Sequence, residues 1–129
     1  KLLTRVEDVM RAGAAVPRVL ADASLTELMR EMSAKGLGAA AIVDAAGKPL
    51  GIFTDGDLRR HIEAGTELRS KTAGELMHTS PRSIRAQALA VDAVALMEEH
   101  HINSVLAVDE NGVLVGALNT HDLLRAKVI

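Results

Sequence analysis

Residues 51–58 read Gly-Ile-Phe-Thr-Asp-Gly-Asp-Leu, and residues 116–123 read Gly-Ala-Leu-Asn-Thr-His-Asp-Leu. In each stretch a glycine and two apolar residues lead to a small polar side chain, and an Asp-Leu pair begins three positions later. An apolar run is typical of a buried strand, and a Thr or Asn followed three residues on by an acid is typical of a helix N-terminus. Each stretch, here called a signature, therefore predicts a strand that leads directly into a helix.

The two signatures belong to a longer internal repeat. Residues 23–60 and 88–125 align without a gap, and residues 6–10 echo residues 73–77. A loop with a proline follows each of these shorter segments, and we take Pro17 and Pro81 as counterparts, which makes one loop three residues longer than the other. Two copies are too few for a solenoid, so we expect a pair related by a pseudo-twofold axis, each half covering the apolar face of the other.

Each repeat predicts the order helix, strand, helix, strand, strand, helix. Capping boxes at Thr4/Glu7 and Thr72/Glu75 predict the first helix of each repeat. The strands and later helices are expected at 18–20, 25–35, 39–43, 50–54 and 55–64, and again at 82–85, 89–97, 104–108, 113–119 and 120–127. The fold class is α+β with two βαββα repeats, at residues 1–65 and 72–129, joined by a linker at 66–71.

Composition narrows the possible functions. The chain has 129 residues, 48% hydrophobic and 25% charged, a net charge of −2 and no cysteine. This composition is typical of a soluble globular protein and excludes disulfides and cysteine metal sites. Phe53 is the only aromatic residue, so base stacking is excluded, and no apolar run approaches the roughly 20 residues of a membrane span. We expect a cytoplasmic protein without nucleic-acid or membrane partners, and a fragment of a longer chain, because Lys1 replaces the usual Met.

The tandem signatures resemble a pair of cystathionine-β-synthase (CBS) domains. Residues 3–10, 36–38, 51–60, 75–77 and 121–126 together are similar to the C-terminal CBS pair of bacterial arabinose 5-phosphate isomerases. The resemblance implies an N-terminal sugar isomerase domain in the same polypeptide. Because the apolar fraction is high for so small a chain, we also expect a dimer of CBS pairs within a tetrameric parent protein. The family's enzyme interconverts ribulose 5-phosphate and arabinose 5-phosphate for synthesis of the lipopolysaccharide sugar Kdo. This chain alone is then a non-catalytic module of a sugar-phosphate isomerase.

The first signature has two interpretations. Thr54 and Asp57 fit a helix cap, in which the hydroxyl accepts an amide hydrogen bond and the carboxylate lies near the positive end of the helix dipole. The same residues fit a ligand site, because a carboxylate can accept two hydrogen bonds from a ribose diol and a helix N-terminus can hold a phosphate. Asp55 lies between Thr54 and Asp57 and is a further candidate. Arg59 either lies on a solvated helix face or neutralises an anionic ligand.

The second signature keeps Asp122 and replaces Thr54 by Asn119, and its interpretations as a cap and as a ligand site are evenly balanced. His121 can contact an anion if it is protonated. The helix-to-strand corners at Gly38 and at Asn103 and Ser104 face the inter-repeat cleft in CBS pairs, although both also fit caps and turns. Further candidates come from the two proline loops, whose residues reach the same clefts: Val16, Pro17, Thr79, Ser80 and Pro81.

Catalytic and metal motifs are missing from the sequence. The five histidines lack metal-ligand spacing, and there is no nucleophile elbow, Walker loop or dinucleotide-binding glycine motif. We therefore expect no catalytic residue, no metal and no required cofactor, and a free-standing enzyme is the least favoured class. The leading hypothesis is a regulatory module that binds an anionic nucleotide or CMP-sugar between the repeats. Pathway logic makes CMP-Kdo the first candidate ligand, ahead of AMP or ATP, and the alternative is a structural oligomerisation module with empty clefts.

Overall fold

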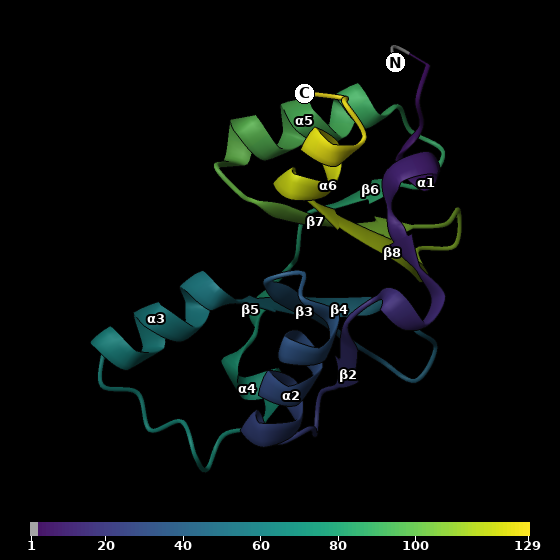
Figure 1. Ribbon diagram of the computed structural model, residues 1–129. Helices are drawn as coiled ribbons and strands as arrows, with labels where there is room; N and C mark the ends of the chain where they lie inside the picture. The colour runs from purple at the N-terminus through teal and green to yellow at the C-terminus, as the bar shows by residue number, and fades with distance from the viewer. Residues whose placement is uncertain (1–2) are drawn as a thin grey trace. The chain divides into compact units, whose positions relative to one another are not determined.

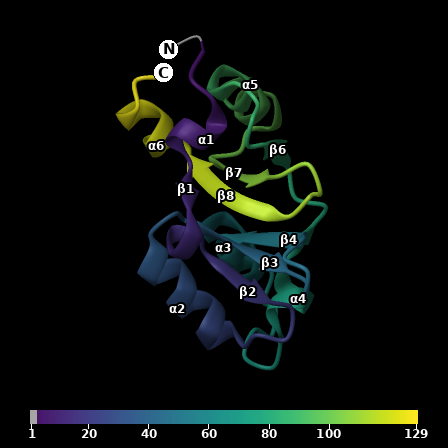
Figure 2. The same ribbon diagram turned by 90° about the vertical axis from the view of Figure 1, so that its right-hand side faces the viewer.

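The computed structural model describes residues 3–129, and the chain forms two compact units (Figures 1 and 2). The terminal unit contains Lys1–Val16 and Arg82–Ile129, and the central unit is Pro17–Pro81. The sequence repeats at residues 1–65 and 72–129 therefore do not coincide with the compact units. The N-terminal segment, up to Val16, packs with the second repeat. The segment that ends at Pro81 packs with the first repeat.

Both units have an α+β architecture, as the sequence predicts. The elements of the terminal unit are α1 (Val6–Val9), β1 (Arg11–Ala12), a 3₁₀ turn (Gly13–Ala15), β6 (Ser83–Arg85), α5 (Ala90–His100), β7 (Ser104–Val108), β8 (Leu114–Asn119) and α6 (Thr120–Arg125). The elements of the central unit are β2 (Arg18–Leu20), α2 (Leu25–Lys35), β3 (Ala39–Val43), β4 (Pro49–Thr54), α3 (Asp55–Glu63), α4 (Ala73–Leu76) and β5 (His78–Thr79). The predicted helices and strands are present with ends shifted by at most a few residues.

Each unit has a four-stranded sheet of the same topology. The strand order is β1-β8-β7-β6 in the terminal unit and β2-β3-β4-β5 in the central unit. β6 and β2 pair in parallel with β7 and β3, and every other pair is antiparallel. The two-residue strands β1 and β5 are absent from the sequence prediction, because an apolar alternation needs more residues than these strands contain.

One apolar core fills each unit. In the terminal unit, α1, α5 and α6 pack on one face of the sheet through Val6, Met97, Leu123 and their neighbours (Figure 1). In the central unit, α2 and α4 pack on the sheet around Leu28 and Phe53. Val6, Leu28 and Phe53 are completely buried. The N-terminal segment therefore contributes directly to the core that the second repeat builds.

The short first helices differ in how they begin. Thr72 is the N-cap of α4, where its amide donates to Glu75 at 2.9 Å and its hydroxyl accepts from the Glu75 amide at 3.3 Å. The bond from the Thr72 amide, together with one that the Thr72 hydroxyl donates to the same carboxylate oxygen at 3.3 Å, lowers the pKa of Glu75 below its usual value. The matching prediction for Thr4 is wrong, because α1 begins one residue later: Arg5 is its N-cap and donates its amide to Asp8 at 2.8 Å. Acidic residues stand at both positions 7 and 8, so the sequence alone does not show whether Thr4 or Arg5 is the N-cap.

The prolines are not counterparts in the fold. The carbonyl of Pro17 accepts from Ala41 at the start of the β2–β3 pairing, and the equivalent acceptor for Leu106 is the carbonyl of Arg82. Pro81 precedes that position by one residue. The two loops therefore differ by two residues rather than three, since β2 and β6 begin at Arg18 and Ser83.

A close backbone approach holds β1 and β5 on their sheets. A Cβ at Gly51 would lie 2.7 Å from the carbonyl oxygen of His78, and one at Gly116 would lie 2.9 Å from that of Arg11. Real Cβ atoms do not approach so closely, so only glycine fits these two positions. The first residue of each signature is thereby explained by packing.

Along residues 3–129, no helix combines the length and the apolar character that crossing a bilayer demands.

Candidate ligand-binding site

The first signature forms a complete capping box at the N-terminus of α3. The Asp57 amide donates to Thr54 Oγ1 at 3.0 Å, and the Thr54 amide donates to Asp57 Oδ2, also at 3.0 Å. The capping interpretation is therefore confirmed for both residues. It occupies one carboxylate oxygen of Asp57 and leaves the other, Oδ1, to a different partner.

That partner is a surface arginine. Arg60 Nη2 donates to Asp57 Oδ1 at 2.7 Å, one turn along the same helix. The Arg60 side chain is 68% exposed, whereas that of Asp57 is 15% exposed. Arg59 is also exposed, but the contact with Asp57 is made by Arg60, because residues three apart lie on one helix face and residues two apart do not. Both arginines are visible in the sequence. Helical spacing could have shown that Arg60, three residues after Asp57, is the one placed to contact it.

Other candidates of the central unit gather at the same end of its sheet. Gly38 precedes β3, whose first residue pairs with Thr54, and its carbonyl accepts from the Asp55 amide at 3.1 Å. A Cβ at Gly38, where φ is +86°, would lie 3.5 Å from Asp55 Oδ2. Gly38 is thus the open corner beside an exposed carboxylate, while the C-cap of α2 is Gly36. Pro17 joins this group because its carbonyl accepts a hydrogen bond from the Ala41 amide of β3.

The second proline loop takes a different course within the central unit. Thr79 pairs with Gly51, and His78 pairs with Ile52, so β5 runs away from Thr54 as the chain proceeds. Ser80 follows with a positive φ of 54°, and Pro81 is half-buried. The pairing therefore does not bring Thr79, Ser80 and Pro81 to the signature of their own unit.

The terminal unit repeats the arrangement around its own signature. Asn119 caps α6 by accepting from the Asp122 amide at 2.8 Å, and its amide donates to Asp122 Oδ2 at 3.1 Å. Ser104 pairs with Asn119, and the Asn103 carbonyl accepts from Thr120 at 3.0 Å. Asn119 thus replaces Thr54 without loss of the cap. His121 is exposed on the first turn of α6, and Val16 is buried at the end of the 3₁₀ turn, where its amide donates to Gly13.

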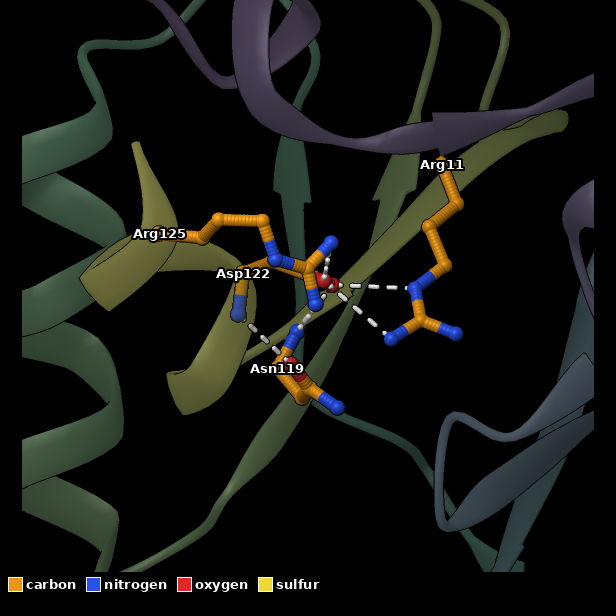
Figure 3. A network of polar contacts seen from close by, with 4 residues as sticks. All are labelled: Arg11, Asn119, Asp122 and Arg125. Carbon is orange, nitrogen blue, oxygen red and sulfur yellow. Dashed lines mark hydrogen bonds and ion pairs between the residues drawn. The ribbon is translucent and has the colours of Figure 1, made fainter. Parts of the chain in front are cut away.

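Asp122 has a partner that sequence reasoning missed. Arg11 of β1 donates from Nε to Asp122 Oδ2 and from Nη2 to Asp122 Oδ1, both at 3.1 Å (Figure 3). The Asp122 side chain is 5% exposed, and that of Arg11 is 20% exposed. Arg125, the counterpart of Arg60, lies 3.9 Å from Oδ1. No local sequence signal marks this contact; the echo of residues 6–10 in residues 73–77 only aligns Arg11 with His78 in the repeat.

The units also contain open hollows next to their helices. One of about 540 Å³ in the terminal unit is bounded by α5, α6 and the chain end, and it includes Asn103 and Thr120. One of about 380 Å³ in the central unit lies between β2 and α2. Among the described residues, no three His, Asp or Glu side chains are grouped as metal ligands would be.

Comparison with known proteins identifies the family. The CBS domain model matches residues 6–64 and 73–129. The chain belongs to the CBS domain family. This CBS pair is 46% identical over 129 residues to the arabinose 5-phosphate isomerase KdsD of Pseudomonas aeruginosa. The alignment covers all of this chain and about 40% of that relative's length.

Solved CBS structures share the fold. The CBS domain pair of protein MJ0100, in complex with 5′-methylthioadenosine and S-adenosyl-L-methionine, superposes with a TM-score of 0.85 at 21% identity, covering 98% of this chain and 97% of that one. CBSX2 in complex with AMP gives a TM-score of 0.82 at 23% identity, covering 97% and 96%. The predicted fold and family are confirmed by these matches.

Proposed function

We propose that this CBS pair is the ligand-binding regulatory module of an arabinose 5-phosphate isomerase. The identity of 46% to a KdsD protein supports the link, and the chain spans about 40% of that relative. The isomerase chemistry would belong to the remaining part of such a protein, N-terminal to this module, and assembly would be through a dimer of CBS pairs. Purified residues 1–129 should not convert ribulose 5-phosphate above a buffer blank.

The ligand is an anionic nucleotide or CMP-sugar with a free ribose diol, and CMP-Kdo is the first candidate. Two solved proteins of this fold hold AMP and S-adenosyl-L-methionine, which contain the same diol. The observation that carries the proposal is the state of Asp57. Among residues 3–129, its Oδ1 atom is held only by the exposed Arg60 on the same helix, so a ligand can replace that contact at little cost.

The remaining candidates would complete the site around that carboxylate. Gly38 gives backbone space, and Asp55 and Thr54 stand on either side of the α3 N-terminus, where the helix dipole favours a phosphate. In the terminal unit, Asn103 and Ser104 hold the equivalent corner beside Asn119. Pro17, whose carbonyl accepts from Ala41 of β3, would border the base.

Calorimetric titration with CMP-Kdo, AMP and ATP tests the proposal. Wild type should bind one of them, and Asp57→Asn should weaken that binding about 10- to 100-fold, because hydrogen bonds to a charged acceptor contribute about 1.5–3 kcal/mol. Glu63→Gln removes a carboxylate from the same helix outside the capping box and serves as the control. Equal affinity of Asp57→Asn and wild type would show that Asp57 is only a cap.

A structural oligomerisation module is the second candidate. It is favoured by the fact that Thr54, Asp57, Asn119 and Asp122 all have partners within their own units. This hypothesis predicts no heat of binding with any of the three nucleotides. It also predicts that removal of the module converts a tetrameric isomerase into smaller species in sedimentation experiments without changing its response to CMP-Kdo.

A further inference from the structure

The two signature aspartates have equivalent positions in the fold but unlike partners. Asp57 and Asp122 each lie at the third position of a helix and each accept an amide hydrogen bond from the N-cap residue. Each also has an arginine three residues later on its helix. The difference comes from the neighbouring two-residue strand, where Arg11 in β1 occupies the position that His78 occupies in β5.

Arg11 binds Asp122 in a bidentate ion pair, with both contacts at 3.1 Å (Figure 3). Such forked pairs are among the stronger polar contacts because two parallel hydrogen bonds are charge-assisted. The carboxylate is 5% exposed, so loss of its counter-ion would leave a buried charge uncompensated. Arg125, at 3.9 Å and 66% exposed, is no substitute for this fork.

The same position in the central unit lacks this fork. His78 is exposed, and Asp57 is bound instead by Arg60, which approaches to 2.7 Å and remains 68% exposed. Exposed ion pairs along a helix contribute little, since water competes for both charges. A neutral ribose diol offers two hydrogen bonds and no charge, so it can replace Arg60 at Asp57 but cannot compensate for the loss of Arg11 at Asp122.

We propose that Arg11 determines which signature binds ligand: it converts Asp122 into a structural carboxylate that ties β1 to α6 and leaves ribose recognition to Asp57. The ligand-binding half of this inference rests on the proposed function. The structural half does not, because it concerns an ion pair within the terminal unit.

Thermal unfolding without ligand tests the structural half. Asp122→Asn keeps an oxygen for the Asn119 amide but removes the charge and turns the other acceptor into a donor, so its effect reports the loss of the forked ion pair. We expect Asp122→Asn and Arg11→Met each to lower the melting temperature by roughly 5–10 °C, and the double variant to fall little further. The matched cycle of Asp57→Asn and Arg60→Met should give shifts of about 1–3 °C that add. If Asp122→Asn is too unstable to purify, Arg11→Lys keeps the charge without the fork and should give about half the shift.

Calorimetric titration with AMP and CMP-Kdo tests the ligand-binding half. Asp57→Asn should weaken binding at least about tenfold, Asp122→Asn less than about threefold, and His78→Arg about tenfold by supplying Asp57 with its own fork. Equal losses for Asp57→Asn and Asp122→Asn, or additive melting shifts for Arg11→Met and Asp122→Asn, would overturn the proposal. If wild type binds neither nucleotide, the proposed function fails, and the melting cycles alone confirm or overturn the ion pair's role.

Discussion

The central unit is one continuous stretch of chain, whereas the terminal unit is assembled from both ends. In the central unit β5 follows α4 and pairs with β4, and in the terminal unit the equivalent strand β1 comes from the opposite end of the sequence to pair with β8. The two strands occupy the same place on equivalent sheets, but they carry different side chains there. Arg11 stands in β1 where His78 stands in β5. The comparison teaches that the strand next to a signature decides whether its aspartate is held by a fork or by a surface side chain.

Truncation is expected to separate the units most strongly. Removing residues 1–16 takes α1, β1 and the completely buried Val6 from the terminal unit and leaves the central unit whole. The terminal unit should lose more than about 4 kcal/mol of its free energy of unfolding, because a core side chain, a sheet strand and a buried ion pair are lost together. Hydrogen exchange should show amides of β7 and β8 losing protection while those of β3 and β4 keep theirs.

A second truncation provides the control. Ending the chain after residue 66 removes α4 and β5 from the central unit and separates β1 from β8, so neither unit is complete. This piece should show no cooperative thermal transition as a monomer, since a domain of ~60 residues is marginal even when intact. A cooperative transition from this piece, or full protection of β7 after removal of residues 1–16, would contradict the assignment of segments to units.

Alanine at the signature glycines is the next largest test. A Cβ at Gly116 would overlap Met10 and the Arg11 carbonyl, and one at Gly51 would overlap Met77 and the His78 carbonyl. Each variant must displace its short strand, so we expect a loss of about 2–4 kcal/mol in urea unfolding. Gly116→Ala should additionally weaken the Arg11–Asp122 pair, which Gly51→Ala leaves intact.

Gly112→Ala supplies the control for those variants. A Cβ there meets no atom within 4 Å, although φ is +80°, so only backbone strain of about 1 kcal/mol is expected. Losses at Gly51 and Gly116 no larger than at Gly112 would show that the strands adjust freely.

The helix caps offer a smaller effect that should be equal in the two units. Thr54→Ala and Asn119→Ala each remove the acceptor for an amide in the first turn, and we expect each to cost about 1 kcal/mol in thermal unfolding. The exchanges Thr54→Asn and Asn119→Thr keep an acceptor and should change stability by a few tenths of a kcal/mol. A large loss on either exchange would mean that the two side chains have unlike roles beyond capping.

The smallest expected effect is a pH dependence confined to the central unit. Burial alone raises the pKa of Glu31, but the hydrogen bond from Lys35, the Arg18 amide and the charges of both residues outweigh it and hold the pKa below the usual 4.5. A carboxyl with a lowered pKa stabilises the fold above its unfolded value, and this contribution is lost as the pH falls through the folded value. The counterpart position in the second repeat is Leu96, which carries no charge.

Glu31→Gln should therefore lower stability by about 0.5–1 kcal/mol at pH 7 and by much less near pH 3, where wild type has lost the same interaction. The measurement is urea unfolding across that pH range. Leu96→Met serves as the control and should show no pH-dependent difference from wild type. A constant penalty for Glu31→Gln at every pH would indicate that its effect comes from packing and not from charge.

The repeat, the main strands and helices, and the residues of both signatures can be read directly from the sequence. These features are local: a capping box is readable because its partners are three residues apart, and the strands β3 and β7 are readable because five residues in succession fit a buried strand. The family resemblance rests on the same local letters. The structure adds that Gly38 lies at the same sheet end as Thr54 and Asp57, because a hairpin connects β3 and β4.

The segments that complete each sheet and the partners of each signature aspartate depend on long-range contacts that become visible only in the folded chain. Arg11 and Asp122 are far apart in the sequence, and β1 is too short to show a periodicity, so nothing local marks their contact. The prediction that Pro17 and Pro81 are counterparts was wrong for the same reason. The register of these loops is set by backbone pairing with β3 and β7, and the prolines do not determine it. A strand of only two residues has no pattern of its own that fixes its position. Its position is set by hydrogen bonds to the neighbouring strand and by the glycine there, which has no Cβ to block the close backbone approach.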